Sequence, residues 1–270
     1  MGNLDGKVAV VTGATWVPEG GLNIGGAVAS ALVDRGATVV AVDKSEEGVD
    51  ALVQSLNKDR ETEAAFAYPV DLREAAAAEE LVSWAEGRLG GVDVLVNNAG
   101  IFRGDDGDVG TLALDVWEDV LAVNLTSPLR LIQSVLPYMR RSGGSIINTS
   151  STHSFAGDAR LSAYGVSKAG LNALTMYVAS QYGGEGVRCN AICPGSTTSP
   201  PAQRLPEVAQ AIHRRYALNP RLNSPQDLAS VFAFLASDES LGINGMVLRV
   251  DAGLLAHQPF MDDLEDLARQ

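Results

Sequence analysis

The chain has 270 residues, a hydrophobic content of 46% and a formal net charge of −13 at pH 7. The apolar content supports a large core, and the negative charge argues against nucleic acid or an anionic membrane surface as a partner. No apolar run approaches the eighteen residues that a membrane-spanning helix requires, so we expect no membrane span.

The N-terminal segment follows a strand, loop, helix, strand order. Residues 7–12 (KVAVVT) suit a buried parallel strand, residues 13–26 form a glycine-rich loop, and an Ala-rich helix comes next. The following apolar run, 38–42, ends in Asp43. This order predicts a dinucleotide-binding unit in which N–H groups at the helix start bind pyrophosphate and the carboxylate binds the adenine ribose. Asp43 would repel a 2′-phosphate, which favours NAD over NADP, although the adjacent cation of Lys44 could tolerate that phosphate.

Polar residues follow each strand predicted in the middle of the chain. Residues 92–96 (VDVLV) predict a strand that is followed by residues 97–100 (NNAG), and Asn124 lies inside a long helical stretch. Residues 145–148 (SIIN) predict a strand that delivers Ser151 at its carboxyl end. Because open α/β sheets bind ligands at this end of their strands, these residues predict one shared cleft.

Tyr164 and Lys168 are four residues apart in a segment, 161–181, that reads as a helix, so they share a helix face. A free phenol has a pKa of about 10 and is a poor acid near neutral pH. A unit charge at about 4 Å contributes roughly 4 kcal/mol at an effective dielectric near 20, equal to about 3 pH units. We therefore expect Lys168 to lower the pKa of Tyr164, while Ser151 holds the substrate oxygen against the phenol.

The last predicted strand, 187–192 (VRCNAI), carries Cys189 and leads into Cys193. Strand geometry over four residues places these two sulfurs too far apart for a disulfide. The histidines are too scattered to suggest a metal site, and no metal is expected; they are His153, His213 and His257.

In these motifs the chain resembles the classical short-chain dehydrogenases/reductases, from about Lys7 to Gly253. The matching motifs are Thr12-Gly13, Asp71-Leu72, Asn97-Asn98-Ala99-Gly100, Asn124, Ser151, Tyr164-x-x-x-Lys168, Pro194-Gly195 and Val250-Asp251-Ala252-Gly253. Each motif is weak alone, but the ordered set is highly specific. The resemblance implies an α/β fold with a single-domain, Rossmann-type, doubly wound parallel sheet and helices on both faces, spanning residues 1–270.

The resemblance also assigns roles to residues. Tyr164 would be the general acid/base, Lys168 would hold the nicotinamide ribose, Ser151 would orient the substrate, and Asn124 would hold a water that links Lys168 to solvent. The implied cofactor-binding residues are Gly13, Asn23, Ile24, Asp43, Asp71, Leu72, Asn98, Ala99, Gly100, Tyr164, Lys168, Pro194, Gly195, Thr197 and Ser199. The expected substrate-pocket residues are Phe102, His153 and Arg160. A substrate lid is expected at about 196–218 and a C-terminal tail at about 254–270.

The glycine loop departs from the family pattern, because Gly13 and Gly25 are twelve residues apart and the loop carries six extra residues. Asn23 occupies the place of the middle glycine, where it could adopt a left-handed backbone and cap the helix. Alternatively, Gly20-Gly21 cradles the pyrophosphate and Asn23 only caps, with Trp16 packed over the adenosine or on the surface.

The expected activity is NAD(H)-dependent interconversion of a secondary alcohol and a ketone on a small molecule. Three other residues separate Tyr164 from Lys168, whereas enoyl-thioester reductases of this superfamily have six, which favours carbonyl chemistry. The alternatives are ketoacyl reduction on an acyl carrier protein, and a non-catalytic NAD-binding sensor or scaffold. Residues 169–184 contain no charge, so we expect the outer face of their helix to pack against another subunit, in a homotetramer or a dimer. A cytoplasmic location is expected, because the chain enters its first strand with no room for a signal peptide.

Overall fold

The computed structural model describes residues 4–17, 21–199, 207, 211, 215–219, 221–258 and 267–268. The strands are β1 (Val8–Thr12), β2 (Trp16–Val17), β3 (Gly21–Leu22), β4 (Thr38–Asp43), β5 (Ala65–Pro69), β6 (Val94–Asn97), β7 (Gly144–Thr149), β8 (Val187–Pro194) and β9 (Val247–Val250). The helices are α1 (Ile24–Val33), α2 (Glu46–Asn57), α3 (Ala77–Leu89), α4 (Leu114–Leu121), α5 (Ser127–Ser142), α6 (Ser162–Tyr182) and α9 (Pro225–Ala236). Short helical turns are η1 (Ala122–Thr126), η2 (Thr152–Ser154), η3 (Gly183–Glu185) and η4 (Asp238–Ser240).

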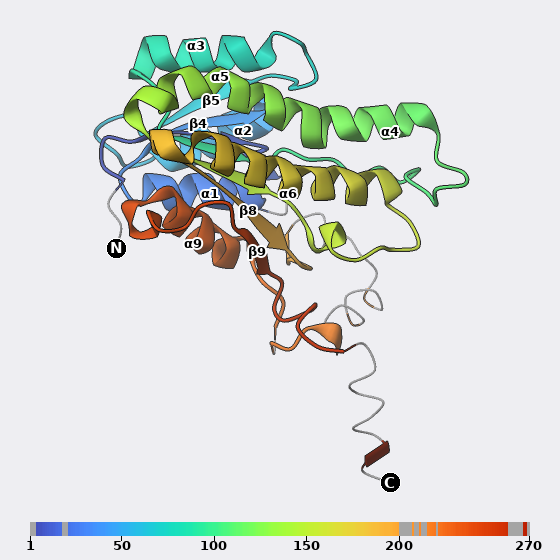
Figure 1. Cartoon of the computed structure of the whole chain (residues 1–270). Helices are drawn as coiled ribbons and strands as arrows, with labels where there is room; N and C mark the ends of the chain where they lie inside the picture. Colours follow the sequence, from blue (N-terminus) through green and yellow to red (C-terminus); the bar gives the residue numbers. More distant parts are fainter. Residues whose placement is uncertain are drawn as a thin grey trace.

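Seven strands form one parallel sheet in the order β5-β4-β1-β6-β7-β8-β9 (Figure 1). The chain builds outward from β1 to β5, then crosses to β6 and builds outward in the other direction. This reversal between β1 and β6 is the switch point at which doubly wound sheets bind nucleotides. The predicted α/β class and parallel sheet are confirmed.

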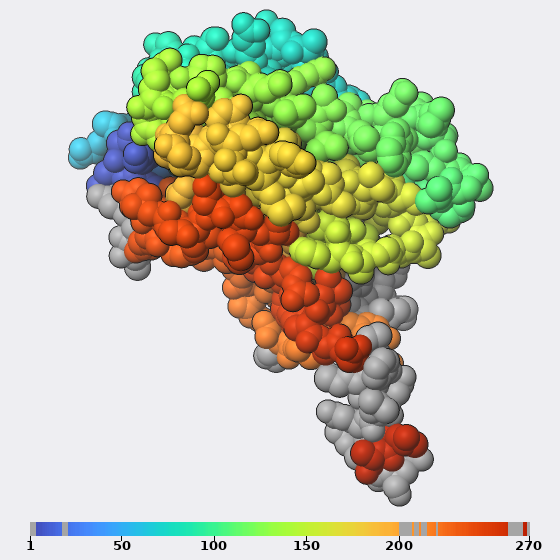
Figure 2. Space-filling model, viewed as in Figure 1, coloured from blue at the N-terminus to red at the C-terminus, as the bar shows by residue number. Residues whose placement is uncertain are grey.

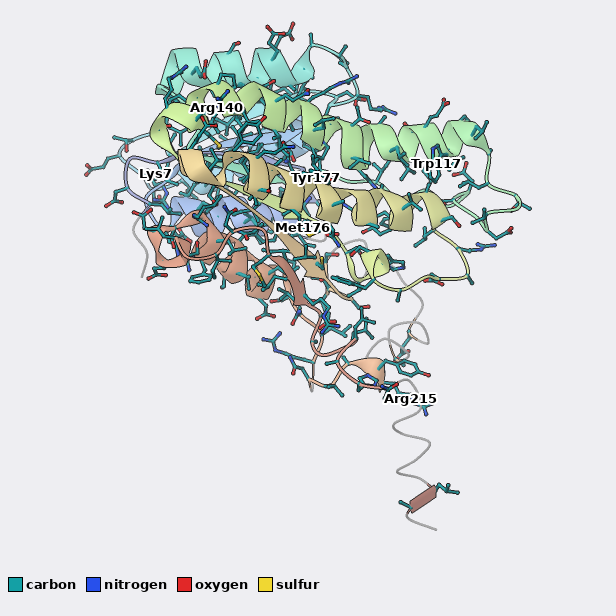
Figure 3. The ribbon with its side chains drawn as sticks, viewed as in Figure 1. Lys7, Trp117, Arg140, Met176, Tyr177 and Arg215 are labelled. Carbon is teal, nitrogen blue, oxygen red and sulfur yellow. The ribbon has the colours of Figure 1, made fainter. Side chains whose placement is uncertain are left out.

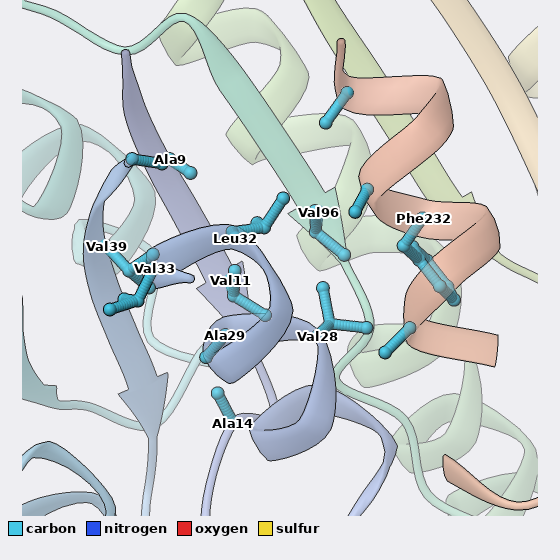
Figure 4. Close-up of a cluster of buried hydrophobic side chains, with 14 of the residues drawn as sticks. Ala9, Val11, Ala14, Val28, Ala29, Leu32, Val33, Val39, Val96 and Phe232 are labelled. Carbon is cyan, nitrogen blue, oxygen red and sulfur yellow. The ribbon is translucent and has the colours of Figure 1, made fainter. Parts of the chain in front are cut away.

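Helices cover both faces of the sheet because the strands are apolar on both sides. Along β1, Ala9 and Val11 contribute to one buried cluster and Val10 to the other, as the alternation of side chains along a strand requires. The first cluster packs the sheet against α1, α2 and α9, where Leu32 and Phe232 are fully buried (Figure 4). The second packs it against α3, α5 and α6.

The predicted helix at 161–181 is confirmed as α6, and the long helical stretch around Asn124 is α4, η1 and α5 in succession. Both cysteines are buried and free, as their spacing predicts. Across the described parts of the chain, no helix combines the length and apolar character needed to cross a bilayer. Much of the predicted lid at 196–218, together with His213 and most of the tail at 254–270, lies outside the described residues.

Candidate active site

The carboxyl ends of the parallel strands open into a cavity of about 1060 Å³. The sequence-predicted residues on its wall are Gly13, Asn23, Ile24, Asp43, Asp71, Leu72, Asn98, Ala99, Gly100, Phe102, Ser151, His153, Tyr164, Lys168, Pro194, Gly195, Thr197 and Ser199. Asn124 is fully buried and does not line the cavity, and Arg160 is exposed and does not line it either. The fold therefore gathers nearly all of the predicted site from segments distant in sequence.

Tyr164 and Lys168 project from the first turns of α6 into this cavity. The Lys168 Nζ lies 5.7 Å from the centroid of the Tyr164 ring. The same amine donates a hydrogen bond of 2.7 Å to the carbonyl of Thr149 at the end of β7. Lys168 is only 3% exposed, so a single backbone carbonyl replaces most of the water that an ammonium would otherwise bind.

Burial controls the protonation of both groups. It raises the pKa of the Tyr164 phenol above its ordinary value, and hydrogen bonding with Ser151 opposes part of this rise. Burial lowers the pKa of the Lys168 ammonium from 10.5 to about 8. The expected net fall in the pKa of Tyr164 is therefore wrong for this arrangement, because loss of solvent is the largest contribution and the ammonium of Lys168 donates to the Thr149 carbonyl. At neutral pH the phenol carries its proton and the lysine its charge.

Ser151 stands at the carboxyl end of β7, where an extended backbone makes it the N-cap of η2. Its Oγ accepts a hydrogen bond of 3.2 Å from the backbone N–H of His153. The Nδ1 of the same histidine lies 3.3 Å from this oxygen, and its Nε2 lies 3.2 Å from a carboxylate oxygen of Asp158. The His153 ring meets the Tyr164 ring edge to face at 5.6 Å. Ser151, His153 and Tyr164 therefore form one contiguous polar group on the cavity wall.

Asn124 sits in η1, a π-helical turn between α4 and α5 of the kind that often marks a functional site. Its carboxamide accepts from the N–H of Ile101 at 2.8 Å and donates to the carbonyl of Ile101 at 2.9 Å. A side chain on Gly100 would place its Cβ 3.3 Å from the Lys168 Nζ and 3.4 Å from the Asn124 Oδ1. Gly100 therefore approaches both Asn124 and Lys168 closely, and a side chain at this position would contact both.

Asp106 positions Tyr164 and was missed by the sequence analysis. Its carboxylate is 1% exposed and accepts from the backbone N–H groups of Ala163 and Tyr164, at 3.0 and 2.9 Å. Its backbone carbonyl also accepts from Leu161, which precedes α6 with a left-handed φ of 64°. An acid at a helix N-terminus satisfies unpaired N–H groups and interacts favourably with the helix dipole. No local motif could reveal this contact, because the capping residue comes from a separate loop.

Within the extended glycine loop, β2 pairs antiparallel with β3, and Gly20 of the alternative pyrophosphate cradle lies outside the described residues. Asn23 caps α1 by accepting from Gly26 N–H at 2.7 Å, and it donates to the Gly13 carbonyl at 2.8 Å. Its φ of −75° is extended rather than left-handed, so of the two proposed roles only the cap is observed. Gly13 has a φ of +66°, and a Cβ there would lie 2.8 Å from the Cα of Ala99. Trp16 is 39% exposed.

The other end of the cavity carries Asp43 at the tip of β4, where one of its oxygens accepts from Ser45 N–H. Nearby, Arg73 forms an ion pair with Asp71 and holds the pKa of that carboxyl below its ordinary value. Arg73 also bonds Asp119 at 2.9 Å. The family resemblance implies Asp71 as a cofactor-binding residue, but no sequence pattern identifies Arg73 as its partner.

Comparisons with known proteins agree with this geometry. A family model described as enoyl-(acyl carrier protein) reductase matches residues 19–255. A probable short-chain type dehydrogenase/reductase of Bradyrhizobium diazoefficiens is 39% identical over 267 residues, which cover 97% of this chain and 92% of that protein. The chain belongs to the short-chain dehydrogenase/reductase family.

Other members of the family are similar over the same length. A 7alpha-hydroxysteroid dehydrogenase of Bacteroides fragilis is 34% identical, covering 96% of this chain and 98% of its own. A meso-2,3-butanediol dehydrogenase of Serratia marcescens is 34% identical, with 93% and 96% covered. The crystal structure of a short-chain dehydrogenase/reductase from Burkholderia xenovorans superposes with a TM-score of 0.88 at 31% identity, with 96% and 100% covered. The family places this short-chain dehydrogenase/reductase among the oxidoreductases of alcohols and ketones, which use a nicotinamide cofactor.

Proposed function

We propose that this protein is an NAD(H)-dependent dehydrogenase that interconverts a secondary alcohol and a ketone on a small molecule. The observation that supports this most directly is the meeting of two sets of residues on one cavity wall. Ser151, Tyr164 and Lys168 line the same space as Asp43 and the start of α1. A proton donor and a dinucleotide site therefore share one cleft, which is the requirement for coupled hydride and proton transfer.

The residues present fit a nicotinamide dinucleotide. The Asn23 side chain already accepts a hydrogen bond from the N–H of Gly26. The earlier N–H groups of α1, those of Ile24 and Gly25, would bind a pyrophosphate. Asp43 would accept from the ribose hydroxyls, and its charge would oppose a 2′-phosphate. Lys168 lines the same cavity, where it would hold the nicotinamide ribose. When bound, the cofactor supplies a hydride to a ketone or accepts one from an alcohol.

The protein's own contribution is position and a proton. Tyr164 is protonated at neutral pH because burial raises its pKa, so its hydroxyl can donate to the oxygen of a ketone as that oxygen gains charge. Ser151 lies beside it and would hold the same oxygen. The charge of Lys168 beside the Tyr164 ring would stabilise the phenolate left after transfer. In alcohol oxidation the same groups would act in reverse.

Ketoacyl reduction on an acidic carrier protein is less well supported. Such a carrier requires free positive charge at the mouth of the cavity, and the two arginines among the described residues of its wall are already paired with carboxylates, while Lys44 lies next to Asp43 at the cofactor end. Arg73 is paired with Asp71 and Asp119, and Arg103 is paired with Asp119 and Asp105. The four-residue step from Tyr164 to Lys168 also argues against enoyl reduction, despite the name of the matching family model.

We also propose that the protein assembles as a cytoplasmic homotetramer, or a dimer, through the outer face of α6. Val166, Met176 and Tyr177 on this helix are 49%, 50% and 66% exposed. Met176 and Tyr177 stand on the outer surface of α6 (Figure 3), and α4 and α6 lie open side by side on one face of the molecule (Figure 2). Size-exclusion chromatography with light scattering tests this, since a monomeric mass would contradict it.

A screen of secondary alcohols with NAD and with NADP, and of ketones with the reduced forms, tests the proposed activity. The absorbance of the reduced cofactor reports turnover directly. We expect turnover with at least one alcohol and preference for NAD. Tight cofactor binding without turnover of any substrate would instead favour the non-catalytic sensor.

A further inference from the structure

His153 is held at both ring nitrogens on the wall of the substrate end of the cavity. Its Nε2 lies 3.2 Å from the carboxylate of Asp158 and its Nδ1 lies 3.3 Å from the Ser151 Oγ. An ionised carboxylate can only accept hydrogen bonds, so the proton of a neutral imidazole belongs on Nε2. Nδ1 is then an acceptor, and the Ser151 hydroxyl donates to it.

In this arrangement the only hydroxyl proton of Ser151 is donated to the Nδ1 of His153. Its oxygen also accepts from the backbone N–H of His153 and is hydrogen bonded with Tyr164. To hold a ketone, Ser151 must turn its proton from His153 to the substrate oxygen. The Nδ1 of His153 then loses its donor just as the substrate covers a side chain that is 30% exposed. An acceptor that is covered without gaining a donor is unfavourable.

A substrate can restore the lost hydrogen bond if it carries its own hydroxyl in the right place. Ser151 Oγ would contact both the reacting oxygen and Nδ1, so a hydroxyl on the carbon next to the carbonyl falls within reach of Nδ1. Asp158 keeps Nδ1 in the accepting form and disfavours a substrate carboxylate at this position by like charge. The ring of His153 is also fixed by its edge-to-face contact with Tyr164, which sets its distance from the reacting centre.

We propose that His153, oriented by Asp158, selects substrates with a hydroxyl beside the reacting carbon, namely α-hydroxyketones and the vicinal diols formed from them. The inference rests on the proposed function and names its substrate class. In reduction, the carbonyl carbon gains a hydride from the reduced nicotinamide, its oxygen gains the proton of Tyr164, and the neighbouring hydroxyl is unchanged. The free hydroxyl donates to Nδ1 throughout.

Matched ketone pairs test this selectivity. The kcat/KM values are measured with NADH for 3-hydroxy-2-butanone against 2-butanone, and for 2-hydroxycyclohexanone against cyclohexanone. The wild-type protein should prefer each hydroxyketone by about tenfold or more, which is the effect of one hydrogen bond of about 1.4 kcal/mol. His153→Phe keeps a ring against Tyr164 but removes the acceptor, and it should abolish the preference mainly by slowing the hydroxyketones.

Two further variants separate recognition from a structural role. His153→Asn retains a hydrogen-bonding group near the Nδ1 position and should restore part of the preference. Phe155→Leu is the control, because Phe155 is an exposed neighbour that does not line the cavity, and it should leave the ratio unchanged. Asp158→Asn should reduce the preference by releasing the imidazole to either tautomer.

The inference is overturned if wild type shows no preference, or if His153→Phe retains it. A His153-dependent preference for acetoacetate over 2-butanone would also overturn it, because His153 would then serve as a carboxylate site. If both members of each pair are reduced equally, the alcohol/ketone activity stands and only the selectivity fails. If neither member of either pair is reduced with NADH or NADPH, the selectivity fails together with the proposed activity on small ketones.

Discussion

Replacement of Lys168 by methionine should stabilise the fold while it removes activity. The folded protein holds the pKa of this lysine at about 8, against an ordinary value of 10.5, because the ammonium is buried. A difference of this size corresponds to about 3 kcal/mol of unfavourable free energy when the group is charged at pH 7. Methionine removes that unfavourable free energy, and loss of the hydrogen bond to Thr149 reduces the gain in stability by about 1 kcal/mol. We therefore expect Lys168→Met to be about 2 kcal/mol more stable at pH 7.

The sign of the pH dependence makes this prediction specific. Between the folded pKa of about 8 and the unfolded value of 10.5, the unfolded chain binds more protons than the folded one. The destabilisation of the fold by the buried charge of Lys168 therefore disappears as the pH rises through this window. The advantage of Lys168→Met over wild type should fall from about 2 kcal/mol at pH 7 to near zero at pH 10.

Urea titration of the cofactor-free proteins, followed by tryptophan fluorescence at one fixed protomer concentration, measures both free energies. Lys58→Met, at an exposed position, is the control for loss of one positive charge. A Lys168→Met protein that is less stable than wild type at pH 7 would refute the reasoning. So would a stability difference that stays constant between pH 7 and pH 10.

Three further outcomes are expected. Asp106→Asn leaves one acceptor oxygen for two N–H groups of α6, so the free energy of unfolding in urea should fall by about 1–2 kcal/mol and kcat should also fall. An unchanged free energy of unfolding would show that Asp106 does not stabilise the start of α6. Asp43→Asn should lower the ratio of kcat/KM with NAD to kcat/KM with NADP by about tenfold or more. An unchanged ratio would show that Asp43 does not determine the cofactor preference. Alcohol oxidation requires the phenolate of Tyr164, whose pKa is raised by burial. The rate of oxidation should therefore rise between pH 7 and pH 9, whereas the rate of ketone reduction should not. Equal pH profiles in the two directions would contradict the role of Tyr164.

The sequence was sufficient to predict those parts of the site that depend on local geometry. Tyr164 and Lys168 share a helix face by their spacing, and Ser151 follows a recognisable strand. Parallel strands end at one edge of a sheet, so the cleft followed once the strands were identified. Asp43, at the end of another strand of the sheet, was found for the same reason.

Contacts between distant segments could not be predicted in this way. Asp106 caps α6 from a loop 58 residues before Tyr164, and no motif marks it. The direction of the Tyr164 pKa change was wrong because it depends on how far the surrounding residues shield the phenol from solvent, which spacing does not reveal. β5 was not identified as a strand, since its residues Ala65–Pro69 lack the β-branched side chains that distinguish β1 and β4. The pairing of β2 with β3 likewise lies in the loop insertion, for which the family pattern gives no guide.

In the proposed mechanism, the Tyr164 hydroxyl transfers the proton beside a bound nicotinamide. Single-turnover reduction of a ketone by NADH in wild type and in Tyr164→Phe tests it most directly, with NADH binding measured in parallel by fluorescence. We expect Tyr164→Phe to bind NADH within about threefold of wild type and to reduce the ketone at least about a hundredfold more slowly. A Tyr164→Phe protein that reduces the ketone at the wild-type rate would contradict it.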